Sequence, residues 1–252
     1  MTSIGITPEY EKKAEKFYRV FLETLSGFKI PFVIGGTYAV KYYTDIDRPT
    51  KDIDIFCKAG DYPRILKKFQ DKGFKVSIKD DRWLAKVYQG HYFADIIFGS
   101  IPSMWPITDG WFSRAPTGNV LGLSIRITPP EELIVSKAYR MGRSQFDGAD
   151  VTHLILRCGD TLDWKRILTH MEPYWEVLLI QLLLFRFTYP ADRHIVPEWI
   201  MKELLSRVKH QMAIPPPEDK VCRGSILSHR QYEIAYTDWG YKDITQFFER
   251  KS

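Results

Sequence analysis

Two glycines and two aspartates in the first quarter of the chain have the types and spacing needed for phosphate chemistry. An apolar run ends in Gly35 and Gly36, and a second apolar run carries Asp52 and Asp54 at alternate positions. Glycine lets a bound group approach the backbone, and its amide can face phosphate oxygens. Alternate carboxylates on a strand project from one face and repel each other unless a cation lies between them. Because Mg²⁺ is bound by one or two carboxylates together with substrate phosphates, the pattern predicts chemistry on a nucleoside triphosphate.

This order of residues resembles the nucleotidyltransferase superfamily, which includes DNA polymerase β, the minimal nucleotidyltransferases and the toxins of bacterial abortive-infection systems. The family pattern is a glycine pair, a strand with Asp-x-Asp and a third acidic residue on a later strand. Gly35 and Gly36 match the first part, Asp52 and Asp54 the second, and Asp95 is the candidate for the third.

The resemblance implies an enzyme that transfers a nucleoside monophosphate from an NTP to an acceptor hydroxyl and releases pyrophosphate. Two Mg²⁺ or Mn²⁺ ions would be held by Asp52, Asp54 and Asp95, in the two-metal arrangement that flanks the reacting phosphate. The third carboxylate, Asp95, would lie closest to the attacking hydroxyl and come nearest to a general base.

Five residues are candidates for holding the nucleotide. By resemblance, Gly35, Gly36 and Thr37 would bind the β- and γ-phosphates, and the N-terminus of a short helix over 37–43 would add its dipole. Lys51 directly precedes the acidic pair, and its position is explained equally well by a contact to phosphate or by a surface charge. Lys137 either reaches the phosphates from a later helix or is a solvated charge.

The stretch between the glycines and Asp52 is longer than is usual in the family, with 44–49 predicted as an inserted turn. This turn carries a second acidic pair, Asp45 and Asp47. We prefer Asp52 and Asp54 as the metal-binding pair because the residues around them form a strand, whereas Pro49 closely follows Asp47.

A second polar cluster follows Lys137. Asp147, Asp150 and His153 are three residues apart and are expected on one face of a helix over 147–156. The segment resembles the Lys-Asp-x-x-Asp helix start of the abortive-infection toxins, with Phe146 in place of the lysine. Asp147 is equally explained as a helix cap, and His153 as a structural residue.

The pattern of elements predicts an α+β protein. A small mixed sheet with few helices is expected over 1–127, a helical domain over 128–214, and a tail packed on the body over 215–252. A helix over 7–27, strands at 31–34, 52–56, 74–78, 83–88 and 92–98, and a helix over 62–72 make up the first part. Helices are expected from 128 to about 141 and over 147–156, 162–171, 173–187 and 197–208.

Composition indicates a folded cytoplasmic protein. Hydrophobic residues make up 44% and charged residues 27%, and the net charge of +5 permits a polyanionic acceptor without requiring one. The three widely spaced cysteines predict neither a disulfide framework nor a zinc site. The most apolar run, 175–187, is too short and too charged to span a membrane, so no membrane partner is expected.

Two other functions remain open from the sequence. One is a nucleotide-binding or sensing module without turnover, although the presence of all three carboxylates disfavours it. The other is a toxin of a toxin–antitoxin pair that uses the same chemistry on tRNA or protein, with an antitoxin as partner. The acceptor (tRNA, protein or a small molecule) and the preferred NTP are not specified by the sequence.

Overall fold

A computed structural model describes residues 7–99 and 106–248 of the chain. The chain divides into two compact units, Met1–Pro129 and Pro130–Ser252. The first contains a five-stranded sheet with helices, and the second is mostly helical, so the predicted α+β class is confirmed. None of the helices in the described residues has the length and hydropathy required to cross a membrane.

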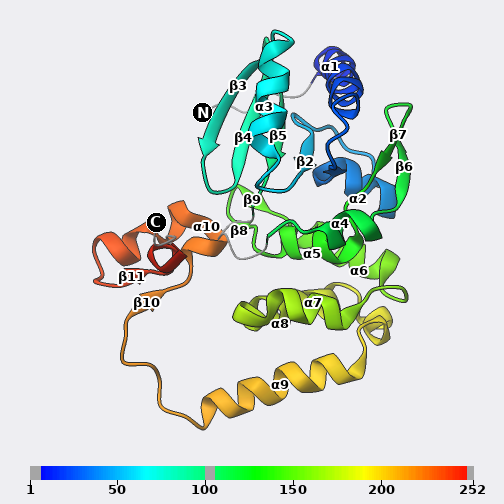
Figure 1. Cartoon of the computed structure of the whole chain (residues 1–252). Coiled ribbons are helices and arrows are strands. Elements are labelled where there is room, and N and C mark those ends of the chain that lie inside the picture. The colour runs from blue at the N-terminus through cyan, green and yellow to red at the C-terminus, as the bar shows by residue number, and fades with distance from the viewer. Residues whose placement is uncertain (1–6, 100–105, 249–252) are drawn as a thin grey trace. The chain divides into compact units, whose positions relative to one another are not determined.

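The sheet of the first unit is mixed, with strand order β1-β2-β5-β4-β3 (Figure 1). Only the β2–β5 pair is parallel, and it is the pair that brings two of the predicted site residues together. The strands are β1 (Val33–Ile34), β2 (Asp54–Phe56), β3 (Lys75–Asp80), β4 (Leu84–Gln89) and β5 (Tyr92–Ile97).

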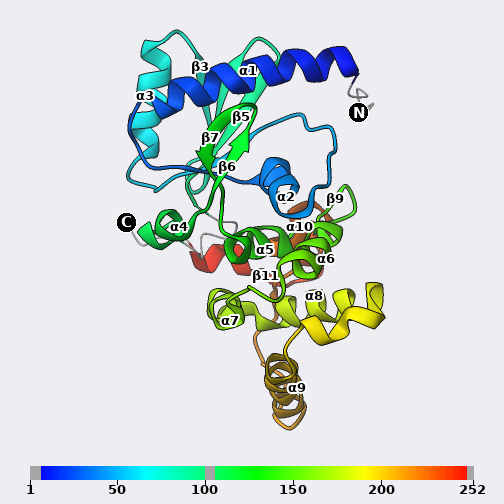
Figure 2. The ribbon, with the colours of Figure 1, turned by 90° about the vertical axis from the view of Figure 1, so that its right-hand side faces the viewer.

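Two helices pack together across one face of this sheet (Figure 2). Helix α1 (Pro8–Ser26) begins at Thr7, whose hydroxyl accepts a hydrogen bond from the Tyr10 amide at 3.2 Å. Helix α3 (Tyr62–Asp71) lies beside it, and the rings of Phe21 and Phe69 stack with centroids 4.8 Å apart. Both rings are fully buried, so this contact joins the two amphipathic helices through their apolar faces.

The other face of the sheet is covered by a helix that the sequence did not predict, α4 (Asp109–Arg114). Its Trp111 and Phe112 form a buried cluster with Phe56 of β2 and Ile97 of β5. Alternate residues of a strand share a face, so the residues two positions before Phe56 and Ile97 continue this face beyond the apolar cluster. Those residues are Asp54 and Asp95.

A helix and a hairpin complete the first unit. Helix α2 (Gly36–Thr44) follows β1 directly, as predicted. Strands β6 (Thr117–Val120) and β7 (Leu123–Arg126) form an antiparallel hairpin, and Leu121 and Gly122 at its tip both have positive φ, as a type I′ turn requires. The chain then returns to β1, where Thr128 donates its amide to the Ile34 carbonyl at 2.8 Å.

The second unit is built from six α-helices within the described residues: α5 (Pro130–Ala138), α6 (Gly148–Cys158), α7 (Trp164–Met171), α8 (Trp175–Thr188), α9 (Glu198–Met212) and α10 (Ser225–Thr237). Polar contacts tie the first of them to the others. Glu132 of α5 accepts from Arg166 of α7 at 2.7 Å, and Gln181 of α8 donates to the Ala138 carbonyl at 2.8 Å. Burial alone would raise the pKa of Glu132, but the hydrogen bonds from His170 and Arg166 hold it below its ordinary value.

The described part of the tail contains helices and strands that were not predicted from the sequence. Besides α10 it contains a parallel pair, β10 (Val221–Cys222) with β11 (Lys242–Asp243). Gln231 of α10 accepts from the Arg143 amide at 2.7 Å, in the turn of a second hairpin, β8 (Met141–Gly142) with β9 (Gln145–Phe146).

One prediction for the first unit is wrong in detail, because Asp52 precedes β2 instead of lying in it. The hydrogen-bonded pairing of β1 with β2 does not extend to Asp52. Strand β1 ends at Ile34, opposite Ile55, and the next amide, that of Gly35, donates to the Asp54 carbonyl at 2.9 Å. The ladder therefore orders Asp54, and Asp52 is held by other contacts.

Candidate functional site

The carboxylate of Asp54 lies directly against the start of α2. A Cβ atom placed on Gly36 would lie 1.8 Å from Asp54 Oδ2, and Gly36 has φ +55°. Both observations require glycine at this position. Gly35, the N-cap residue, provides no side-chain cap for the helix. The Asp54 carboxylate therefore lies at a helix N-terminus that is suited to anions. A phosphate could bind there only together with a cation, because the carboxylate would otherwise repel it.

Asp95 lies beside Asp54 because the two residues are partners in the parallel β2–β5 register. Neighbouring strands are about 4.8 Å apart, which places the two carboxylates as neighbours on one face. Asp95 is 9% exposed, and its Oδ1 lies 2.8 Å from the ammonium of Lys86, its partner on β4. Lys86 also lies over the ring of Phe93, 3.8 Å from its centroid. Lys86 was not among the predicted site residues, although its position in a strand of alternating polar and apolar residues could have indicated it.

Asp52 is positioned by the loop that precedes it. The hydroxyl of Thr50 donates to Asp52 Oδ1 at 3.0 Å and also contacts the Asp52 carbonyl at 3.1 Å. Thr50 was not among the predicted site residues, and its spacing of two before the acidic pair could have indicated it. Lys51 is exposed, and Thr37 lies in the first turn of α2 at an intermediate depth.

The carboxylate oxygens of Asp54 and Asp95 are of the donor type that hard divalent cations prefer. Carboxylate oxygens are what Mg²⁺ and Mn²⁺ prefer, and in phosphoryl-transfer sites one or two of them act together with substrate phosphates. Asp54 and Asp95 provide such a pair. No cluster of three or more His, Cys, Asp or Glu side chains that could hold a metal ion is found within residues 7–99 and 106–248. The prediction that Asp52 completes the metal site stays a prediction.

The polar cluster of the second unit is a buried ion-pair network. Lys137 of α5, 7% exposed, places its ammonium 2.7 Å from Asp150 Oδ2 and 3.1 Å from Asp147 Oδ2. Asp147 occupies the N-cap of α6 without a capping hydrogen bond from its side chain. His153 lies beside the ring of Tyr189, with centroids 6.3 Å apart. A triphosphate role for Lys137 stays a prediction, and any such role must compete with these two carboxylates.

Replacing Lys137 with methionine is expected to lower the free energy of unfolding by about 3–5 kcal/mol, since it removes the ammonium that lies 2.7 Å from the buried Asp150 carboxylate. Urea denaturation followed by circular dichroism measures the change. The double variant Lys137→Met/Asp150→Asn also removes the buried negative charge and should recover part of the lost stability. Equal stability of wild type and Lys137→Met would show that the network contributes little.

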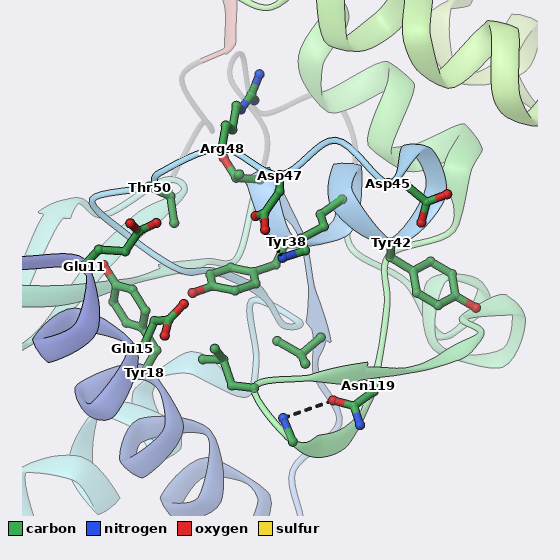
Figure 3. Close-up of a pocket in the computed structure, with 15 residues that line it drawn as sticks. Glu11, Glu15, Tyr18, Tyr38, Tyr42, Asp45, Asp47, Arg48, Thr50 and Asn119 are labelled. Atoms are coloured by element: carbon green, nitrogen blue, oxygen red, sulfur yellow. Dashed lines mark hydrogen bonds and ion pairs between the residues drawn. The ribbon is translucent and has the colours of Figure 1, made fainter. Parts of the chain in front are cut away.

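A cavity of about 580 Å³ opens beside the catalytic candidates in the first unit (Figure 3). Its walls come from α1, α2, the 45–50 loop and the tip of the β6–β7 hairpin, where Asn119 accepts from the Gly122 amide at 3.0 Å. Thr37 and Thr50 both line it, so it adjoins the start of α2 and the loop that holds Asp52. The acidic pair Asp45 and Asp47, set aside in the sequence analysis, lies in its wall, with Asp47 Oδ2 2.7 Å from the Lys41 ammonium.

Comparison with known proteins gives matches among solved structures alone, since no protein-family model and no curated protein matches the chain. The lincosamide antibiotic adenylyltransferase LnuA, bound to lincomycin, is 18% identical over 56% of this chain and 94% of that one, with a TM-score of 0.40. ANT(2")-Ia, in complex with adenylyl-2"-tobramycin, is 16% identical over 64% and 99%, with a TM-score of 0.46. A nucleotidyltransferase-like protein from Paracoccidioides brasiliensis is 14% identical over 69% and 93%, with a TM-score of 0.42.

At these identities the likeness concerns the fold alone. The structure is similar to solved structures of nucleotidyltransferases, the superfamily that the glycine and aspartate motifs of this chain resemble.

Proposed function

We propose that this protein is a metal-dependent nucleotidyltransferase that transfers a nucleoside monophosphate from an NTP to an acceptor hydroxyl. The observation that carries the proposal is the contact between Asp54 and Gly36, where a cation-binding carboxylate meets a helix N-terminus suited to phosphate. Each feature alone has a structural explanation. Their contact, with Asp95 in register beside Asp54, is what a triphosphate held through a divalent cation requires.

Different residues of the chain would bind the phosphates and the metal. The backbone amides of the first turn of α2 would bind the phosphate oxygens, and Gly36 would let them approach. Asp54 and Asp95, with Asp52 as a third ligand, would hold Mg²⁺ or Mn²⁺. When bound there, the metal would lower the pKa of the attacking hydroxyl and neutralise the leaving pyrophosphate. Lys86, whose ammonium lies 2.8 Å from Asp95 Oδ1, would balance the charge of that carboxylate.

The proposal predicts that NTP binding depends on the metal. Each of the four NTPs with Mg²⁺ should be compared with the same NTP and EDTA by thermal unfolding. A nucleotide at a hundred times its Kd stabilises the folded state by about 2.7 kcal/mol, so the Tm should rise by about 5–10 °C with Mg²⁺ and much less with EDTA. Without the cation, the carboxylates and the phosphates repel each other.

The matched control is Asp71→Asn, a change on the exposed end of α3, where Asp71 pairs with Lys67. It should keep the metal-dependent shift, and Asp54→Asn should lose it. A shift of equal size with Mg²⁺ and with EDTA would contradict the proposal and indicate a nucleotide-binding module that needs no metal.

A further inference from the structure

Lys86 brings a positive charge to the place where the metal would bind. Its ammonium lies 2.8 Å from Asp95 Oδ1, and the two side chains are only 20% and 13% exposed. Asp95 is one of the two carboxylates proposed to hold Mg²⁺ or Mn²⁺. Charges that are this well buried are screened much less by salt than charges on the surface. The ammonium and the metal would therefore compete for the same carboxylate.

The position of Lys86 is set by the sheet and not by Asp95 alone. Strand β4 pairs Lys86 directly with Asp95, and residues directly opposite each other in an antiparallel pair share one face of the sheet. Phe93 lies two residues before Asp95 on this face, and the Lys86 ammonium is 3.8 Å from the centroid of its ring. If a metal bound Asp95 Oδ1, the strand register and this cation–π contact would still keep the ammonium beside it.

The charges of the site form a row across three strands. Asp54 of β2 is the register partner of Asp95 of β5, and Asp95 in turn is the register partner of Lys86 of β4. Two neighbouring carboxylates repel each other, and an ammonium beside them offsets part of that repulsion. A divalent cation between the carboxylates would offset it too. The ammonium and the metal thus balance the same negative charge, and each disfavours the other.

A triphosphate would change this balance. Its phosphates are proposed to lie at the start of α2, where Asp54 meets Gly36, and the reacting phosphate would lie against Asp54 and Asp95. The negative charge of the phosphates attracts the metal and gives the Lys86 ammonium another anionic partner. Metal that arrives with a nucleotide is therefore bound more readily than metal alone.

We infer that Lys86 keeps Mg²⁺ or Mn²⁺ from binding to the carboxylate pair until a nucleotide binds with it. The inference rests on the proposed function, and it adds how the metal site is regulated. Lys86 is a positioning residue in this role, since it acts on the metal through Asp95. The sign of its effect on metal affinity separates this role from a supporting one. A residue that only orients Asp95 would strengthen metal binding, whereas a competing cation weakens it.

The test uses Mn²⁺ alone as the probe and counts the free ion by electron paramagnetic resonance during a titration of the protein without nucleotide. Changing a residue that contacts a metal ligand alters metal affinity by about 10–100-fold. Because Lys86→Met removes a competing charge, it is expected to bind Mn²⁺ at least tenfold more tightly than wild type. Lys86→Gln keeps a polar side chain opposite Asp95 and should change the affinity in the same direction. Adding Asp95→Asn to Lys86→Met should abolish the gain.

The matched control is Lys75→Met. Lys75 is exposed on β3 and pairs with Tyr88, two residues beyond Lys86 on the same face, so the variant loses the same charge away from Asp95. Exposed charges are largely screened beyond about 8 Å at an ionic strength of 0.15 M, so Lys75→Met should change the Mn²⁺ affinity by less than twofold.

Thermal unfolding gives an independent readout of the same exchange. Mn²⁺ alone should raise the Tm of Lys86→Met more than that of wild type, whereas Mn²⁺ with NTP should raise the Tm of both. Mn²⁺ binding by Lys86→Met and Lys86→Gln that is equal to or weaker than that of wild type would overturn the inference and leave the proposed function intact. A wild-type protein whose Tm does not respond to NTP with Mg²⁺ or Mn²⁺ would instead overturn the proposed function, and this role of Lys86 with it.

Discussion

Asp54→Asn is expected to reduce nucleotidyl transfer by about 100-fold or more, while the protein stays folded. Loss of a residue that merely orients a metal ligand costs about 10–100-fold, and Asp54 is proposed to be a ligand itself. Asparagine keeps the size of the side chain and removes the charge that would hold the cation. The fold should tolerate the change, because Asp54 contributes to the sheet through its backbone, whose carbonyl accepts from Gly35.

The measurement is transfer of label from an NTP carrying a radioactive α-phosphate, with Tm recorded for every variant. Asp95→Asn should show a loss of the same order, since the two carboxylates are register partners. Asp71→Asn is the control and should retain activity. Activity within a factor of three of wild type in purified Asp54→Asn would refute the metal assignment.

Alanine at the two glycines is expected to separate function from stability. In Gly36→Ala the new Cβ would collide with Asp54 Oδ2, the mobile end of a side chain, so the carboxylate moves and the fold survives. The positive φ of Gly36 adds about 1–2 kcal/mol of strain. Transfer should therefore fall by more than tenfold with a modest decrease in Tm.

In Gly35→Ala the collision is with the buried ring of Phe56, at 2.1 Å. Overpacking of this kind costs about 1–3 kcal/mol, so Gly35→Ala should lose mainly stability. Gly60→Ala, with open space around it, should change neither quantity. If Gly36→Ala retained full activity, the carboxylate would not depend on the space that this glycine leaves.

The sequence was sufficient for the parts of the fold that local chemistry determines. Thr7 and Pro8 begin α1 where a cap and a first-turn proline predict, and the glycine pair leads into α2. The candidates Asp54 and Asp95 could be predicted because each lies in an apolar strand. That they are register partners could not, since a parallel pairing depends on the crossover between its strands.

The elements that were missed are short and depend on tertiary packing. Helix α4 has six residues, too few to form alone, and Trp111 and Phe112 stabilise it by packing against the sheet. The β6–β7 hairpin turns at Leu121 and Gly122, without the Asn-Gly or Asp-Gly pair that would have indicated it. The cavity was missed for the same reason, because this hairpin supplies part of its wall.

The parallel β2–β5 register has a consequence for the order of folding. All of α3, β3 and β4 lies between Asp54 and Asp95 in the chain, so their pairing is a non-local contact that forms only when this crossover has closed. The closure brings two like charges together, and Lys86 on β4 is the counter-ion of one of them, Asp95. A chain that has been synthesised only as far as β4 therefore could not form the proposed metal site, and the proposed activity would require a completed sheet.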